Sequence, residues 1–196
     1  MQTHHTLTLT LFSFFLLFLS AARTVAPQDL LHSSCTHSRY PTLCLQTLST
    51  FTGPTKTTLN LAQAAIQVSL THARALSSYL NTLHPQPPSN KRNQVALNDC
   101  AKQISDSVDE LTKTLKELQH LRMGTFQWQM SNAQTWASTA LTNGDICING
   151  FNDGGDRKMT VEVKRRVTDV TMLTSNALYF IDLVGQTISG KPHLNP

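Results

Sequence analysis

One stretch of this 196-residue chain, residues 95–121, constrains the fold more than any other. Its apolar residues recur at three- and four-residue steps, which is the spacing of a single stripe along an amphipathic helix. The stripe consists of Leu97, Cys100, Ile104, Val108, Leu111, Leu115 and Leu118. The charged residues Lys102, Asp106 and Asp109 fall on the opposite side of the same helix. A helix with one apolar stripe is not stable alone, so other helices must pack against it.

Three further segments carry the same helical spacing, and they span residues 56–83, 126–143 and 160–188. Stretches rich in proline or glycine separate the segments, at 84–90, 123–124 and 152–156. Residues 28–51 predict two shorter helical pieces, with Pro41 in the first turn of the second piece. Thr55 is then expected to cap the next helix. The pattern predicts an all-α fold, an antiparallel up-and-down four-helix bundle with an N-terminal helical hairpin.

The periodicity leaves two details of the segment 126–143 open. Asn143 and Gly144 interrupt it, and a glycine inside a helix costs about 1 kcal/mol relative to alanine, so Cys147 is expected on the last turn or just beyond it. Trp136 lies among small alanines, so we expect it in the core.

The first 22 residues contain no Lys, Arg, Asp or Glu, and an apolar run precedes the small residues Ser20, Ala21 and Ala22. This pattern is typical of a secretory signal peptide cleaved after Ala22, with Ala26 as the alternative site. A retained membrane anchor would need about 20 apolar residues, and this run is shorter and contains threonines. The rest of the chain suits one domain, residues 27–190, secreted and free of the membrane.

Four cysteines in a secreted chain indicate two disulfides, for which three pairings are possible. Local geometry favours Cys35 with Cys44 and Cys100 with Cys147, because the first pair closes a small turn and the second ties distant helices. The competing interpretation is a zinc site, since His32 and His37 flank Cys35. The chain lacks the paired ligand spacing that zinc sites use, so we expect no metal.

Composition and motifs argue against an enzyme and against a nucleic-acid-binding protein. The net charge of +4 is a mild basic excess, and aromatic residues do not interleave with the basic ones as in single-strand binders. The chain has no nucleophile elbow, phosphate-binding glycine loop or His-Glu-x-x-His motif, so we expect neither an enzyme nor a cofactor. Asp106 and Asp109 lie on the solvent side, where Asp109 is expected to pair with Lys113.

Four blocks of the sequence resemble a known family. They are Tyr40-Pro41-Thr42-Leu43-Cys44 after Cys35, Ala96-Leu97-Asn98-Asp99-Cys100, Gln134-Thr135-Trp136-Ala137-Ser138-Thr139-Ala140-Leu141-Thr142 before Cys147, and Ser175-Asn176-Ala177-Leu178. In this order they resemble the plant invertase and pectin methylesterase inhibitors over essentially the whole mature chain. The resemblance implies a disulfide-stapled four-helix bundle that covers the substrate cleft of a plant enzyme in the cell wall space.

Two details of the resemblance concern the target. The third and fourth blocks look more like the pectin methylesterase inhibitors, and the Pro-Lys-Phe tripeptide of several invertase inhibitors is missing. The expected partner is therefore pectin methylesterase in a 1:1 complex, with acid invertase as the alternative. A third interpretation, a bundle that carries an apolar ligand, is disfavoured because the third helix offers alanines rather than a roomy interior.

The resemblance also implies which residues contact the target enzyme. The acids six and nine places after the third cysteine match Asp106 and Asp109. Three positions depart from the family pattern: Lys102 replaces an acid, Ile146 replaces a threonine, and Asn149 replaces another acid. These departures predict a changed affinity or a changed target at the same surface.

Overall fold

The computed structural model describes residues 27–83, 91–151 and 157–189. The predicted signal peptide, residues 1–22, and its two alternative cleavage sites lie outside the described residues. So do the proline-rich loop at 84–90 and the glycine-rich loop at 152–156.

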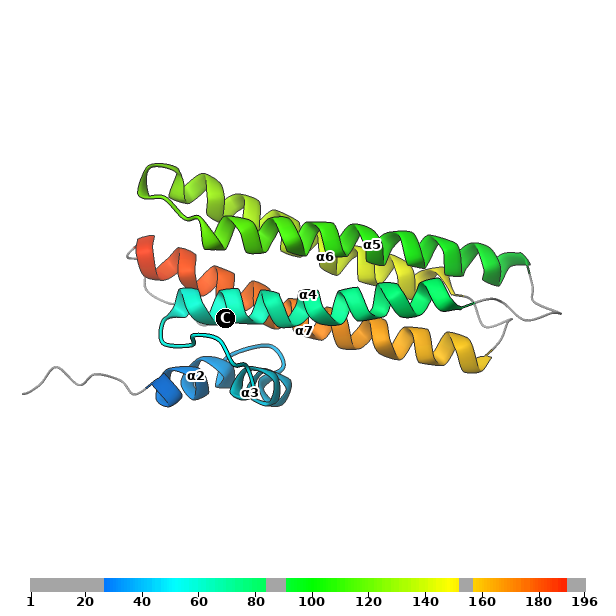
Figure 1. Ribbon diagram of the computed structural model, residues 1–196, viewed down its shortest axis with the longest axis horizontal. Coiled ribbons are helices and arrows are strands. Elements are labelled where there is room, and N and C mark those ends of the chain that lie inside the picture. Colours follow the sequence, from blue (N-terminus) through cyan, green and yellow to red (C-terminus); the bar gives the residue numbers. More distant parts are fainter. Residues whose placement is uncertain (1–26, 84–90, 152–156, 190–196) are drawn as a thin grey trace, which may run out of the picture.

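Four long helices form the body of the molecule: α4 (Thr58–Thr82), α5 (Lys91–Gln119), α6 (Phe126–Gly150) and α7 (Arg157–Ser189). Each runs antiparallel to the one before it, and α4 packs against α7 to close the ring (Figure 1). Two short helices, α2 (Pro27–Thr36) and α3 (Pro41–Ser49), form a hairpin that packs against α4 and α7. A single 3-10 turn, η2 (Met123–Thr125), precedes α6. The predicted four-helix bundle with an N-terminal hairpin is confirmed.

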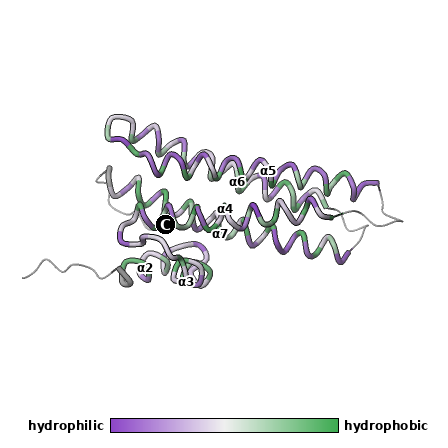
Figure 2. Tube along the Cα trace, in the orientation of Figure 1, coloured by the Kyte–Doolittle hydropathy of each residue, from purple (hydrophilic) through white to green (hydrophobic). Residues whose placement is uncertain are grey.

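The core follows from one spacing that all four long helices share. Each buries a seam of residues separated alternately by four and three positions, as in coiled coils. Figure 2 shows the matching mixture of hydrophobic and hydrophilic residues along each helix. The seams are Ala62, Ile66, Ser69, Ala73, Leu76 and Leu80 on α4; Asn93, Leu97, Cys100, Ile104, Ser107, Leu111, Thr114 and Leu118 on α5; Phe126, Met130, Ala133, Ala137, Ala140, Gly144 and Cys147 on α6; and Val163, Val167, Val170, Thr174, Ala177, Ile181 and Val184 on α7.

The seam of α5 differs from the predicted stripe at two positions. Val108 and Leu115 are only half-buried at the rim of the core, whereas Ser107 and Thr114 are fully buried. Both hydroxyls bond to backbone oxygens: Ser107 Oγ lies 2.9 Å from Gln103 O, and Thr114 Oγ1 lies 2.9 Å from Glu110 O. A small side chain whose hydroxyl bonds to the backbone of its own helix fits the seam. A prediction from apolar residues alone therefore picked Val108 and Leu115 instead of Ser107 and Thr114.

Helix α6 is longer than predicted, because it continues through Asn143 and Gly144 to Gly150. Gly144 lies on the seam, where an added Cβ would meet Thr171 Cγ2 on α7 at 2.3 Å. The glycine therefore allows close contact between helices rather than ending one, and Cys147 lies in the last turn of the helix, as expected. Trp136 is half-buried rather than inside the core, which corrects the expectation for that residue.

Two predicted helix ends also move. The N-cap of α4 is Thr57 rather than Thr55, since Thr57 Oγ1 accepts a hydrogen bond of 3.1 Å from Asn60 N. Helix α5 ends at Gln119, before the 3-10 turn that contains Gly124. The turn is organised by Gln129, which accepts from Arg122 N at 2.8 Å and donates to His120 O at 2.9 Å. This buried amide ties α6 to the end of α5.

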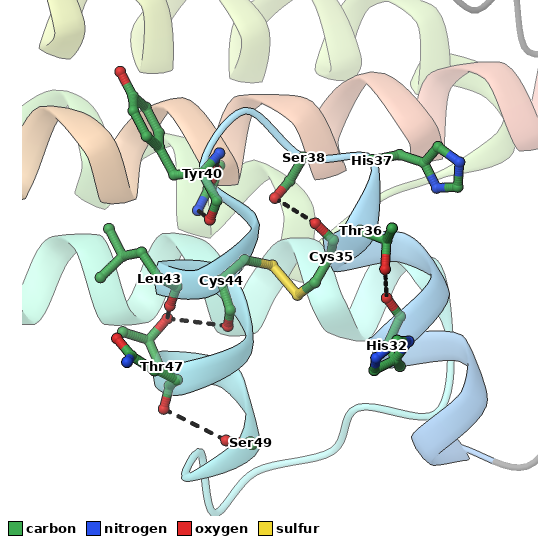
Figure 3. The surroundings of a disulfide bond; sticks show 12 residues. His32, Cys35, Thr36, His37, Ser38, Tyr40, Leu43, Cys44, Thr47 and Ser49 are labelled. Atoms are coloured by element: carbon green, nitrogen blue, oxygen red, sulfur yellow. Dashed lines mark hydrogen bonds between the residues drawn. A yellow bond between two sulfur atoms is a disulfide. The ribbon is translucent and has the colours of Figure 1, made fainter.

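Both expected disulfides are present, Cys35–Cys44 and Cys100–Cys147. The first closes the hairpin, as Figure 3 shows, and the second joins α5 to α6. Their sequence separations are 9 and 47 residues. In the chain-entropy model the shorter loop contributes about 2.5 kcal/mol and the longer one about 4 kcal/mol. The link between α5 and α6 is therefore the more stabilising of the two.

Asn176 on α7 holds the hairpin against the bundle through the backbone of Tyr40. Tyr40 N donates to Asn176 Oδ1 at 2.9 Å, and Asn176 Nδ2 donates to Tyr40 O at 3.0 Å. Asn176 is 3% exposed, so water does not compete for these two hydrogen bonds. The asparagine of the Ser-Asn-Ala-Leu block thus has a structural role, which is to dock the turn between α2 and α3.

We expect Asn176→Ala to destabilise the protein by about 1–3 kcal/mol, because the half-buried N–H of Tyr40 loses its partner, whereas its carbonyl keeps the bond from Cys44 N. Chemical denaturation measures the change, and hydrogen exchange at the Tyr40 amide should become faster than in the parent protein. Asn132→Ala is the matched control, since Asn132 Nδ2 donates to a side chain, Glu117 Oε1 at 3.2 Å, rather than to the backbone of the hairpin. Unchanged exchange at Tyr40 in Asn176→Ala would show that other contacts hold the hairpin.

Candidate protein interface

The charged residues singled out on α5 lie on its outer surface. Lys102 Nζ and Asp106 Oδ2 form an ion pair of 2.8 Å, with side chains that are 72% and 44% exposed. The hydrogen bond to Asp106, with the attraction between the charges, raises the pKa of Lys102. Asp109 is exposed, and it lies three residues further on, about 60° around the helix from Asp106. The three residues therefore share one outer face but present different charges.

The disulfide between Cys100 and Cys147 fixes how far α6 is shifted along α5, and so which α6 residues lie beside Lys102 and Asp106. Its Cα atoms are 4.3 Å apart, so Lys102, two residues after Cys100, lies close to the level of Ile146, one residue before Cys147. Ile146 is 49% exposed, and Asn149 is exposed about one turn beyond it. Further along, Ser107 Oγ donates to Ala140 O at 3.4 Å, which keeps the two helices in the same register. The structure thus brings Lys102 and Ile146 to nearly the same level of the α5–α6 pair, whereas Asp106 lies one turn further along, at the middle of α5.

Beside these charges, α6 presents a surface that is almost uncharged. Of its 25 residues, Asp145 alone carries a charge. Hydroxyl side chains are the commonest kind at its exposed positions, and Thr135, Ser138, Thr139 and Thr142 line a shallow hollow with Gln134. Trp128 is 69% exposed near the start of the helix. Depletion of charge together with exposed aromatic side chains is typical of the centre of a protein–protein interface. Sequence reasoning missed this face, although the missing charges were visible in the segment.

Lys113 bridges the two helices at the middle of the same surface. Its Nζ lies 3.0 Å from Glu110 Oε1 and 5.9 Å from the centre of the Trp136 ring. The predicted pairing of Lys113 with Asp109 is therefore wrong. Glu110 is closer to α6 than Asp109 is, and there the lysine can contact both the carboxylate and the half-buried aromatic ring. Asp109 is left without this neutralising partner on the outer face.

The described part of the chain offers little that a catalytic or metal site would use. Within residues 27–83, 91–151 and 157–189, no group of three or more His, Cys, Asp or Glu side chains is arranged to hold a metal. No described helix is long and apolar enough to cross a membrane. What the surface does offer is a rigid pair of cross-linked helices with charges on one and neutral hydroxyls on the other. Such an arrangement suits binding to another protein.

Comparison with known proteins agrees with the sequence pattern. Residues 29–180 match a family model described as plant invertase/pectin methylesterase inhibitor. The chain is 48% identical over 172 residues to "Pectinesterase inhibitor 3" of Arabidopsis thaliana, a match that covers 85% of this chain and 83% of that protein. It is 34% identical over 179 residues to a "21 kDa protein" of Daucus carota, covering 87% of this chain and 91% of that protein.

The fold is shared with a solved structure. A mutant form of a pectin methylesterase inhibitor from Arabidopsis superposes with a TM-score of 0.59 at 16% identity, covering 76% of this chain and 93% of that one. At this identity the likeness concerns the fold alone. The family match spans most of the chain, and it includes all four disulfide-bonded cysteines and the α5–α6 surface. The chain therefore belongs to the plant invertase/pectin methylesterase inhibitor family, a family of enzyme inhibitors rather than of enzymes.

Proposed function

We propose that this protein is a secreted inhibitor of pectin methylesterase. It forms a reversible 1:1 complex that covers the pectin-binding cleft of the enzyme and so limits the removal of methyl esters from pectin in the plant cell wall. Residues 1–22 serve as the signal peptide, and residues 27–190 form the inhibitor domain, which acts in the extracellular space. The names of the relatives support the target, and the charge-free surface of α6 supports binding through a protein interface.

The observation that carries the proposal is the outer face of the α5–α6 pair. It combines the half-exposed carboxylate of Asp106 and the exposed carboxylate of Asp109 with the apolar side chain of Ile146, on helices that a disulfide joins. A surface that is rigid before binding loses little conformational entropy when a partner binds. The exposed charges are placed to steer association and to select the partner.

Acid invertase is the second target to consider, because Lys102, Ile146 and Asn149 depart from the family pattern at this surface. Lys102 also neutralises part of the charge of Asp106. A partner surface with mixed charges would suit such a face better than a purely basic one. The target is therefore decided by measurement on both enzymes.

Purified mature protein should reduce methanol release from methylated pectin by pectin methylesterase at a molar ratio near one. Sucrose hydrolysis by acid invertase, measured with the same preparation, should remain unchanged. Reduced and carboxymethylated protein is the control, because the loss of both disulfides removes the fold. Inhibition of invertase alone would replace the proposed target with the alternative one.

The double substitution Asp106→Ala with Asp109→Ala should weaken inhibition at least tenfold, if these carboxylates contact the enzyme. The melting temperature should stay nearly constant, because exposed charges contribute little to folding. The inhibition constant and a thermal melt are the two measurements. Asp169→Ala is the matched control, an exposed carboxylate on α7 that pairs with Arg165. An unchanged inhibition constant in the double variant would remove this face from the interface.

Lys102→Glu tests the departure from the family pattern. The substitution breaks the ion pair with Asp106 and adds a carboxylate to the outer face, so inhibition of an enzyme with a basic surface should become tighter. The gain should shrink with added salt, because exposed charges are screened within about 8–10 Å at ordinary ionic strength. If inhibition weakens instead, the lysine contacts an acidic site on the target. Inhibition constants at low and high salt against both enzymes distinguish these outcomes.

A further inference from the structure

A second hollow lies on the other flank of α6, where this helix packs against α7. It has a volume of about 410 Å³ and is lined by polar side chains from both helices. Gln127, Ser131 and Gln134 come from α6, and Asp182 and Gln186 come from α7. None of the described residues that line the hollow is Lys or Arg. Its wall therefore presents amides, a hydroxyl and one carboxylate, together with the side chain of Met130 and the backbone at Gly185.

Asp182 is the unusual member of this set. Its Oδ1 accepts a hydrogen bond of 2.8 Å from Gln134 Nε2. Burial raises the pKa of Asp182, and the bond from Gln134 offsets only part of that effect. A half-buried carboxylate that has no cation among its described neighbours costs folding free energy rather than supplying it. Its position is therefore better explained by something that binds there than by the stability of the bundle.

Gly185 provides an independent reason to regard the hollow as a site. It lies inside α7, where glycine costs about 1 kcal/mol relative to alanine. An added Cβ would meet only Met130 Cε, at 4.0 Å, which is an ordinary contact. Gly144 is different, because there a Cβ would overlap Thr171 Cγ2 at 2.3 Å. Packing requires the glycine at 144 but not the one at 185, so Gly185 leaves space in the wall that any larger residue would fill.

The chemistry of the wall selects a ligand rich in hydroxyl groups. A carboxylate and amide oxygens accept hydrogen bonds from hydroxyls, and the amide nitrogens donate to hydroxyl or ester oxygens. Trp128 lies three residues before Ser131, hence next to it on the helix surface, and its exposed ring offers an apolar face at the rim. An anionic sugar would meet the charge of Asp182 without a compensating cation. A neutral sugar ring suits both the polar wall and the aromatic rim.

We propose that this hollow, the α6–α7 groove, binds a neutral saccharide, namely a methyl-esterified stretch of pectin. The choice of pectin rests on the proposed function, whereas the preference for a neutral, hydroxyl-rich ligand rests on the groove itself. Gln134 lies six residues before Ala140, about 9 Å along the helix, and faces α7 rather than α5. The groove thus opens toward α7 rather than toward α5, and it shares Gln134 with the hollow on the outer face of α6. The inhibitor is held on the substrate of the enzyme that it regulates.

Titration calorimetry without any enzyme tests the groove. The probes are a methyl-esterified oligogalacturonide and the same oligomer after de-esterification. The parent protein should bind the esterified oligomer at least tenfold more tightly than the de-esterified one. Asp182→Ala should raise the dissociation constant at least tenfold, because it removes the acceptor for the sugar hydroxyls.

Two further variants distinguish a blocked groove from a misfolded protein. Gly185→Leu should abolish binding by filling the groove, and Gly185→Ala, whose added methyl group makes only an ordinary contact, should weaken binding while the melting temperature holds or rises. Asp145→Ala, which removes an exposed carboxylate from the same helix, should bind like the parent. Absence of binding by the parent, equal binding by all variants, or preference for the de-esterified oligomer would each overturn the proposal.

The enzyme assays are independent of this titration. A protein that binds the esterified oligomer but inhibits neither enzyme would refute the proposed function and leave the groove in place. A protein that inhibits pectin methylesterase but does not bind the oligomer would refute the groove alone.

Discussion

The packing of α5 against α6 is the contact on which the rest of the structure depends. Three separate interactions set the register of the pair: the Cys100–Cys147 disulfide, the hydrogen bond from Ser107 Oγ to Ala140 O, and the amide of Gln129 at the turn. They are spread along the length of the helices, so a shift of one helix past the other would break all of them together. A fixed register is what turns residues on two helices into one surface.

The small residues of α6 explain how a neutral helix can hold this position. Alanines and Gly144 occupy its seam, so α7 approaches closely on one side and α5 on the other. Packing and the disulfide hold α6 in place. None of the ion pairs between described residues involves its outer residues. Its exposed hydroxyls and Trp128 are then available for partners on both flanks. The charges of the surface come from α5 instead, at Lys102, Asp106 and Asp109.

Much of the fold could be predicted because it depends on periodicity and on strong local signals. Apolar spacing located all four long helices, prolines and glycines separated them, and the cysteines indicated which segments meet. The prediction of the core was wrong where a polar residue or a glycine occupies a buried position. Ser107 and Thr114 bond to the backbone of their own helix, and Gly144 serves close packing, so neither polarity nor helix propensity identified their role.

The sequence by itself determined the fold class, the pairing of helices through cysteines and the family, because each depends on residue type and spacing along the chain. Tertiary structure decided which side chains share a surface. Asn176 meets the backbone of Tyr40 from 136 positions away, Lys113 turns to Glu110 and Trp136, and Gln134 meets Asp182 across two helices. These contacts depend on the rotation and register of each helix about its axis. Rotation and register are set by the packing of all four seams at once, which no single segment encodes.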